Sequence, residues 1–366
     1  MPPEFTADRT AAVRALFPYL ARRVYLDTAA AGLCWEGHGA AVARFYDEVK
    51  NRGYDARPEW WALIGKVRER LALWLGVEAA DVTFVSNTTE GLNLAAHSLS
   101  FRSGDRIVLA EDEFPSVARI WSPAQQAGAE LVLVKVLREE ERQARLMEAV
   151  DARTRVLVVS HTNSATGTTL DIDALGRHCH EYDALFMVDG IQALGAVPTQ
   201  LAGVDVYAAS FFKWMLSGFG LGILVTSGRA REAMTPAWRG YANIDDPAQL
   251  QYAHVNTPAL YGLDGTLDFL ESVGWESIYA QVRALGAHLV DAADRQGLQL
   301  VTPRDQRAGI YVFQASNGEA ARLRLAERGI SVSARGAGVR VSPHFYNTKD
   351  EVDRCAIELA QAIALT

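Results

Sequence analysis

The feature that most constrains this chain is a series of short apolar segments, rich in β-branched residues, between residues 81 and 226. They read DVTFVS, RIVLAED, AELVLVKV, RVLVVSHT, ALFMVDG, VDVYAAS and GLGILVT, and helical stretches separate many of them. Several are almost continuously apolar, which is typical of parallel strands covered on both faces. Strands that alternate with helices indicate an α/β fold, so we expect a large domain with a seven-stranded, mostly parallel sheet.

A smaller α+β domain is predicted where the pattern changes, near the segment VNTPALYGL. A long helix-like stretch, GTLDFLESVG, continues into WESIYAQVRALGAHLVDAADRQ, and the short strands GIYVFQ and GVRVSP follow, with helices between and after them. The 366 residues are enough for two domains. We place the boundary near Gly274, so that the large domain covers residues 20–273 and the small domain covers residues 1–19 and 274–366.

Composition excludes several classes of protein. The 36 Lys and Arg residues against 44 Asp and Glu give a net charge of -8, which provides no general attraction for nucleic acid or for an anionic membrane. No apolar run is long enough to span a bilayer, and the N-terminus does not read as a signal peptide. The cysteines Cys34, Cys179 and Cys355 lack the spacing of a disulfide framework or a metal site. We therefore expect a cytoplasmic protein without a bound metal.

A candidate phosphate site lies at the turn SNTTEGLNLAA, where a strand ends and a helix begins. Free backbone N–H groups and the positive end of the helix dipole favour an anion there. The hydroxyls of Thr88 and Thr89 add donors suited to phosphate. Plain helix capping by Thr88 explains the same residues about equally well.

Asp189 and Lys213 are the candidate reactive groups. Asp189 ends an apolar strand at the carboxyl edge of the sheet, where a carboxylate needs a partner such as a protonated pyridine nitrogen. Taken alone, it reads better as a turn-forming Asp-Gly. Lys213 follows a strand among Phe211, Phe212 and Trp214, and apolar surroundings favour the neutral, nucleophilic amine. A lysine that reaches out to solvent is the commoner case, but Ser210 before it and the glycine-rich turn after it favour a functional role.

Three further features refine the interpretation. The glycine-rich turn at residues 218–222 leads into a strand and lacks the spacing of a dinucleotide-binding loop, which argues against NAD. Asn163 follows a strand and could bond a phenolic oxygen, although an Asx turn explains it nearly as well. Arg340 lies in an apolar strand and requires an anion, either a substrate carboxylate or a structural ion-pair partner.

The ordered motifs resemble the class V branch of the fold-type I pyridoxal-5′-phosphate (PLP) enzymes. They are YLDTAAAG, SNTTEGLN, EDEFPS, SHTNSATGT, VDGIQALG, SFFKW, NTPAL and VRVSPHFYNTKDEVD, and the resemblance runs from Tyr25 to the C-terminus. The branch includes aminotransferases, cysteine desulfurases, kynureninases, isopenicillin N epimerase-like proteins and C–S lyases. The combination of VDGxQ with a strand-borne Ser-x-x-Lys is its most specific element here.

The resemblance implies a fold-type I PLP-transferase fold and a role for each matching residue. Lys213 would hold PLP as a Schiff base and move the proton, while Asp189 would pair with the pyridine nitrogen. The remaining implied contacts are Asn163 and Gln192 with the phenolic oxygen, Phe114 with the ring face, Thr88, Thr89 and Ser210 with the phosphate, Thr257 with the phosphate of a neighbouring subunit, Arg340 with the substrate carboxylate, and the Ala29–Ala30 segment near the substrate side chain.

Departures from the cysteine desulfurase pattern affect the expected reaction. Phe114 and Phe212 stand where desulfurases usually carry histidines. The stretch SARGAG before Arg340 is short and has no cysteine, so a persulfide formed by the usual route is not expected.

The expected function is therefore a reaction at the α-carbon of an amino acid, with transamination first, then β-elimination including C–S cleavage, then epimerisation. The implied assembly is a homodimer with shared sites. A non-catalytic PLP-fold binding module is the alternative from another class, and Lys213, Asp189 and Arg340 together argue against it. His161, His344 and Arg335 are interpreted as structural or surface residues. The identity of the substrate, the amino acceptor and the pathway stay open.

Overall fold

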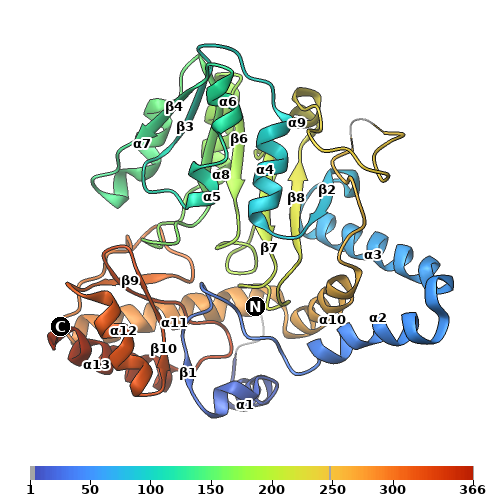
Figure 1. The fold of residues 1–366 in the computed structure, drawn as a ribbon. Coiled ribbons are helices and arrows are strands. Elements are labelled where there is room, and N and C mark those ends of the chain that lie inside the picture. The colour runs from blue at the N-terminus through green and yellow to red at the C-terminus, as the bar shows by residue number, and fades with distance from the viewer. Residues whose placement is uncertain (1–4, 247–248, 366) are drawn as a thin grey trace.

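The computed structural model describes residues 5–246 and 249–365, and its centre is a sheet of seven strands (Figure 1). Residues 1–4 and 366 of the predicted small domain, and residues 247–248 of the predicted large domain, lie outside the described residues. The strands are β2 (Val82–Val85), β3 (Arg106–Ala110), β4 (Glu130–Val134), β5 (Thr154–Ser160), β6 (Leu185–Asp189), β7 (Val206–Ser210) and β8 (Gly222–Thr226). Each lies within one of the seven predicted segments, except that β5 begins one residue before RVLVVSHT.

The sheet is mostly parallel, as the apolar segments predicted. Its order is β2-β8-β7-β6-β5-β3-β4, and only β8 runs antiparallel to its neighbours. Alternate residues of β5 enter different cores: Leu157 and Val159 pack on one face, and Val156 and Val158 on the other. Because both faces are covered, the carboxyl ends of β5, β6 and β7 are the accessible edge of this part of the sheet.

Helices cover the sheet and extend from it. The elements around the sheet are α4 (Thr88–Ser98), α5 (Pro115–Ala118), α6 (Ser122–Gln126), α7 (Arg142–Ala149), α8 (Ile172–Glu181) and α9 (Gly228–Ala233). The helices α2 (His38–Arg52) and α3 (Arg57–Leu75) project from one side as an arm (Figure 1). None of the described helices combines the length and the apolar character that a membrane span needs.

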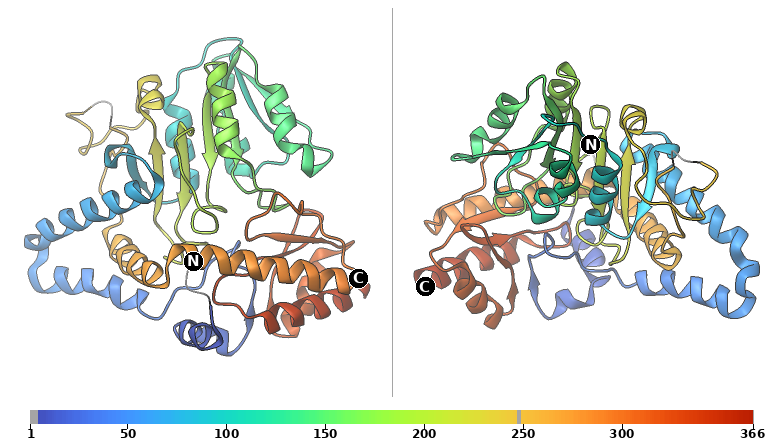
Figure 2. Two further views of the ribbon diagram at one scale, coloured as in Figure 1. Left: turned by 180° about the vertical axis from the view of Figure 1, so that it is seen from behind. Right: turned by 45° about the horizontal axis from the view of Figure 1, so that its top comes forward.

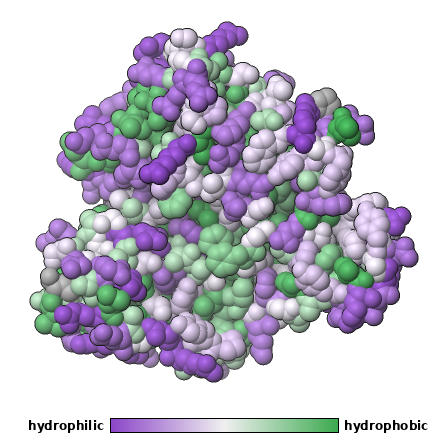
Figure 3. Space-filling model, in the orientation of Figure 1, coloured by the Kyte–Doolittle hydropathy of each residue, from purple (hydrophilic) through white to green (hydrophobic). Residues whose placement is uncertain are grey.

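The C-terminal part of the chain packs beneath the sheet. It contains β9 (Tyr311–Gln314), β10 (Ile330–Ser331), β11 (Ser333–Arg335), β12 (Gly338–Val341), α12 (Gly318–Glu327) and α13 (Lys349–Ala364). The long helix α11 (Trp275–Arg295) runs along the base, as Figure 2 shows from behind. Hydrophobic residues gather in the middle of the face drawn in Figure 3, with hydrophilic residues around them.

The expected long helix across Gly274 is two helices. The first, α10 (Thr257–Val273), ends at Gly274, whose φ of 87° is left-handed, and α11 starts at the next residue. Glycine adopts this conformation at little cost, so the chain changes direction there. The prediction of one continuous helix was wrong, because the spacing of apolar residues does not reveal a single residue with a left-handed backbone conformation.

The N-terminal segment also contributes to the C-terminal part. Helix α1 (Ala7–Ala15) precedes β1 (Val24–Tyr25), which pairs in parallel with β10. Val24 and Leu26 pack in the same core as Leu289 and Phe313. The domain boundaries near residues 19 and 274 stay a prediction. The contacts of Val24 and Leu26 place these two residues with the C-terminal part of the chain.

Candidate active site

A cavity of about 220 Å³ opens at the carboxyl ends of β5, β6 and β7. Ser160, Asp189 and Ser210, the last residues of these three strands, all line it. The other lining residues come from the turns and helix starts that follow strands, and they are Asn87, Thr88, Thr89, Phe114, Ser116, Thr162, Ser164, Ile191, Gln192, Phe212 and Lys213. Its position at the carboxyl edge of an α/β sheet is typical of a site for a small organic molecule.

Lys213 projects into the cavity from a fixed turn after β7. The Gly32 N–H donates to the Phe212 carbonyl at 2.8 Å, and a Cβ on Gly32 would lie only 2.0 Å from the Lys213 carbonyl oxygen. Only glycine therefore permits this approach of the two segments. Burial, and then the charge of Arg340, lower the pKa of Lys213 to about 8, so the neutral amine is accessible near physiological pH.

Asp189 is buried at the end of β6, directly opposite Ser160 of β5. Its Oδ1 accepts from the Ile191 N–H at 3.0 Å. Burial raises the pKa of Asp189 to about 6, against the opposing effects of the Ile191 hydrogen bond and the Lys213 charge. A cation placed against this carboxylate would therefore be strongly favoured.

Four hydroxyl groups gather where α4 begins. Ser210 Oγ accepts from the Thr88 N–H at 2.8 Å and lies 2.9 Å from Thr88 Oγ1. Thr89 Oγ1 lies 2.7 Å from the hydroxyl of Ser116, a residue that the sequence did not single out. The capping residue is Asn87, whose Oδ1 accepts from the Glu90 N–H at 2.9 Å, so capping by Thr88 was the wrong alternative. Hydroxyls beside a helix N-terminus make a suitable site for a phosphate.

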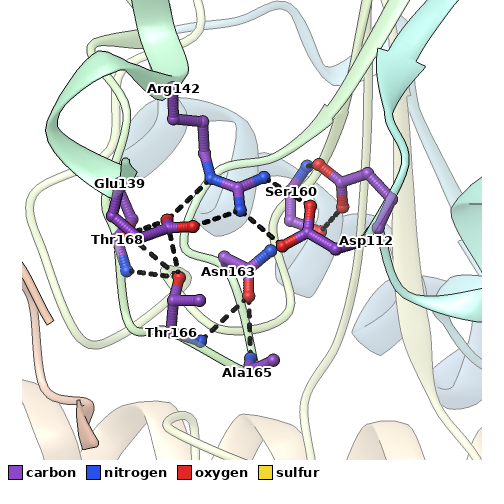
Figure 4. A network of polar contacts seen from close by, with 9 residues as sticks. Asp112, Glu139, Arg142, Ser160, Asn163, Ala165, Thr166 and Thr168 are labelled. Carbon is purple, nitrogen blue, oxygen red and sulfur yellow. Dashed lines mark hydrogen bonds and ion pairs between the residues drawn. The ribbon is translucent and has the colours of Figure 1, made fainter. Parts of the chain in front are cut away.

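Asn163 lies in a loop that a buried ion network holds in place (Figure 4). Its Oδ1 accepts from the N–H groups of Ala165 and Thr166 at 2.8 and 3.1 Å, which is the predicted alternative of an Asx turn. The turn uses the oxygen and leaves the amide N–H groups as donors. Asn163 is buried but is not among the residues that line the cavity.

Gln192 and Phe114 both line the cavity, but the Gln192 side chain is hydrogen-bonded to the protein whereas Phe114 is exposed. Gln192 Nε2 donates to the Ala29 carbonyl at 3.0 Å, and its Oε1 accepts from Trp214 Nε1 at 3.0 Å. One N–H of the Gln192 amide therefore stays available for a ligand. Phe114 as a residue is 48% exposed, which leaves it accessible for stacking.

Arg340 lies in β12 with an exposed fraction of only 2%. Its Nη1 donates to the Ser164 carbonyl at 3.1 Å, and its Nη2 lies 3.6 Å from Asp27. Within the described chain, Nε and Nη2 have no hydrogen-bond partner. Burial lowers the pKa of Arg340 to about 10, with Asp27 opposing the change. A buried guanidinium with unused donors is suited to a carboxylate.

Like Asn163 and Arg340, the predicted site residues Thr257 and Ala30 do not line the cavity. Thr257 starts α10 and lines a separate hollow with Tyr54 and Trp61 of the arm. Ala30 lies in a tight turn, where its N–H donates to the Asp27 carbonyl at 3.0 Å. Neither position contradicts the implied roles, which concern a neighbouring subunit and a substrate.

The similarity to known proteins decides the family. The model of the family "Aminotransferase class-V" matches residues 24–355. The chain belongs to the class-V aminotransferase family. Its members are PLP-dependent enzymes, so the predicted enzyme class and cofactor are confirmed.

Relatives of this class-V chain include proteins with different activities. A probable cysteine desulfurase of Methanothermobacter thermautotrophicus is 26% identical, over 94% of this chain and 96% of the relative. An isopenicillin N epimerase of Streptomyces clavuligerus is 28% identical, over 81% of this chain and 83% of the relative. The apo structure of a cysteine desulfurase from Thermococcus onnurineus matches with a TM-score of 0.88 at 20% identity, covering 100% of both chains, and confirms the fold.

The class-V cofactor fits the residues of the cavity. The buried carboxylate of Asp189 has no cationic hydrogen-bond partner among the described residues, Lys213 has a lowered pKa, and hydroxyls gather at a helix N-terminus. These three features match the pyridine nitrogen, the aldehyde and the phosphate of PLP respectively.

Sequence reasoning missed two buried charges near this class-V site. Glu113 accepts from the Ser160 N–H at 3.0 Å and from the Ser160 hydroxyl at 2.6 Å, and burial raises its pKa. Arg142 binds Asp112 and Glu139 and is 1% exposed. Glu113 directly precedes Phe114 in the motif EDEFPS, but nothing in the sequence shows that Arg142 is buried.

Proposed function

We propose that this enzyme acts at the α-carbon of an amino acid, with transamination as the first candidate reaction. The observation that carries the proposal is that Lys213 and Asp189 line one cavity, while the partly unpaired guanidinium of Arg340 is bound to the carbonyl of Ser164, another residue of its lining. These groups correspond to the aldehyde and the ring of the cofactor and to the carboxylate that every amino acid carries.

The proposal assigns each cofactor contact to a residue at or near the cavity. Asp189 would hold the protonated pyridine nitrogen, and Thr88, Thr89 and Ser210 would hold the phosphate beside the start of α4. Phe114 would stack on the ring, and the unused N–H groups of Asn163 and Gln192 would reach its phenolic oxygen. When bound, PLP withdraws electrons from the α-carbon and so weakens the bonds to it.

Two residues of the chain would act on the substrate. Arg340 would bind the α-carboxylate with its unused Nε and Nη2 donors and so orient the α-carbon. Lys213 would hold PLP until the substrate amine replaces it, and its neutral amine would then take the α-proton and return it. Returning the proton to a different carbon is what distinguishes transamination from epimerisation.

β-Elimination with C–S cleavage is the second candidate, and the relative named as a cysteine desulfurase supports it. The hairpin before Arg340 argues against a persulfide on the chain itself. Strands β11 and β12 are joined by only Gly336 and Ala337, and this turn packs against Ala165. In the β-elimination, the sulfur would therefore leave as a free product.

The relative named as an isopenicillin N epimerase makes epimerisation the third candidate reaction.

The assembly and location are part of the same proposal. We expect a cytoplasmic homodimer in which Thr257 reaches the phosphate site of the neighbouring subunit. The separate hollow that Thr257 lines with exposed aromatic residues of the arm supports this arrangement.

The test is a visible absorbance scan of purified protein loaded with PLP while amino acids are added one at a time. We expect a cofactor band that shifts with some amino acids and not with others. Product analysis then separates transamination, which yields an oxo acid and PLP in its amine form, from elimination, which releases ammonia. A protein that stays colourless after PLP is added would refute the proposal.

A further inference from the structure

Asp27 is the carboxylate that faces the buried guanidinium of Arg340 in the described ion pairs. The nearest atoms, Arg340 Nη2 and Asp27 Oδ1, are 3.6 Å apart. This is too long for a hydrogen bond but short enough for strong attraction between poorly solvated charges. The side chains are 2% and 16% exposed, so solvent screens the pair little.

Ser333 holds the Asp27 carboxylate back from the guanidinium. Its hydroxyl lies 2.8 Å from each carboxylate oxygen. Ser333 is also directly opposite Arg340 across the β11–β12 hairpin, so the two side chains lie on one face. The backbone of Asp27 forms a parallel bridge with Ser342, which fixes the main chain that carries the carboxylate. Asp27 therefore neutralises Arg340 from a fixed position without occupying its donors.

Arg340 does not itself line the cavity but contacts it through Ser164, and we expect a ligand carboxylate to take the donors that Asp27 leaves unused. Arg340 Nη1 donates to the carbonyl of Ser164, a residue that lines the cavity. Arg340 Nε and Nη2 have no hydrogen-bond partner among the described residues. A carboxylate that entered the cavity and bound these donors would lie close to the Asp27 charge.

We infer that Asp27 sets the affinity for the substrate carboxylate by competing with it for Arg340. The inference rests on the proposed function, in which Arg340 binds that carboxylate. In the free protein, Asp27 partly neutralises the guanidinium and stabilises the fold. When a second carboxylate arrives, Arg340 attracts it and Asp27 repels it, and low dielectric strengthens both effects. Asp27 thus lowers the affinity for the substrate carboxylate and raises the stability of the free enzyme.

The test uses propionate, a monocarboxylate that has no amino group to react with the cofactor. Calorimetry on protein loaded with PLP then reports the carboxylate site alone. Asp27→Asn keeps the shape and removes the charge, and we expect propionate to bind about tenfold more tightly, equivalent to about 1.4 kcal/mol. The melting temperature of the ligand-free variant should fall, because a buried cation loses its counter-charge. Unchanged or weaker propionate binding would overturn the inference.

Ser333→Ala is the matched control, because it keeps the Asp27 charge and removes its hydrogen bonds. Asp27 can then approach Arg340 more closely, so we expect propionate to bind more weakly than to the wild type. Tighter binding would show that a loosened hairpin is sufficient and would also overturn the inference, even if Asp27→Asn did not fold. Since propionate binding requires no reaction, failure here is distinct from the absence of any response to amino acids.

Discussion

Lys213 lies where burial and a neighbouring guanidinium both favour its neutral amine. Burial has the larger effect and the Arg340 charge the next, and together they lower its pKa to about 8. Below this pH the ammonium dominates and cannot attack an aldehyde, whereas above it the amine is free to do so. The ionisation of this one side chain should therefore govern capture of the cofactor.

We predict that the rate of covalent PLP capture by the apo protein rises with pH, with a midpoint near 8, and levels off above it. Arg340→Gln removes a repulsive charge, so the Lys213 pKa and the midpoint should both move to higher pH. The measurement is the formation of a borohydride-reducible adduct at a series of pH values. Lys213→Ala is the control that should form no adduct, and a midpoint unmoved in Arg340→Gln would refute the coupling.

At the scale of elements, the loop after β5 depends on helix α7. Arg142 binds both Asp112 and Glu139, and Glu139 in turn accepts from the hydroxyls of Thr166 and Thr168 (Figure 4). Thr166 also donates its backbone N–H to Asn163. The guanidinium thereby fixes the loop that carries Asn163 and the Ser164 carbonyl bound by Arg340.

We predict that Arg142→Ala lowers the free energy of unfolding by about 3 kcal/mol, because it leaves two carboxylates facing each other without their shared cation. Urea denaturation measures this change, and PLP affinity should fall with it because Asn163 is no longer held. Arg145 is the matched control on the same helix, with exposed ion pairs to Glu141 and Glu148. Arg145→Ala should change the stability by no more than about 0.5 kcal/mol. Equal effects of the two variants would contradict a structural role of the network.

The sequence pattern predicted the strands well where apolar residues dominate a short segment. The central strands were found because each is a short apolar run, and their parallel order placed Asp189 and Ser210 at one edge. The break at Gly274 and the cap at Asn87 were missed because they depend on single backbone conformations. The pairing of β1 with β10 joins residues about 300 positions apart, and no local pattern reports such a contact.

The site was predicted in the same partial way. Residues within motifs, such as Lys213 and Thr88, lie at the cavity as expected because they stand at strand or helix ends, and their roles stay a prediction. Asp27 and Arg142 act through partners brought near by folding, so their burial and pairing could not be inferred from spacing. Gln192 was found, but its engagement with Ala29 and Trp214 was not.

At the scale of the whole molecule, the position of Thr257 requires a second chain if its implied role is correct. It lines a hollow between α10 and the arm, away from the cavity that contains Lys213. Tyr54 and Trp61 of that hollow are 58% and 55% exposed in the single chain, which is unusual for large aromatic residues. We therefore predict a mass in solution of twice the 40.0 kDa of the chain, as measured by light scattering.

Shared sites make a sharper prediction than mass alone. Lys213→Ala removes the reactive amine from its own cavity, and Thr257→Ala removes a phosphate contact from the neighbouring one. If Thr257 acts across the interface, a mixed dimer of the two variants contains one cavity with both residues intact and one with neither. Unfolding and refolding the two inactive or weakened variants together should then restore up to about half of the activity per mixed dimer, because each subunit contributes to its partner's site. If both residues served the same chain's cavity, every cavity of the mixed dimer would lack one of them, and mixing would restore nothing.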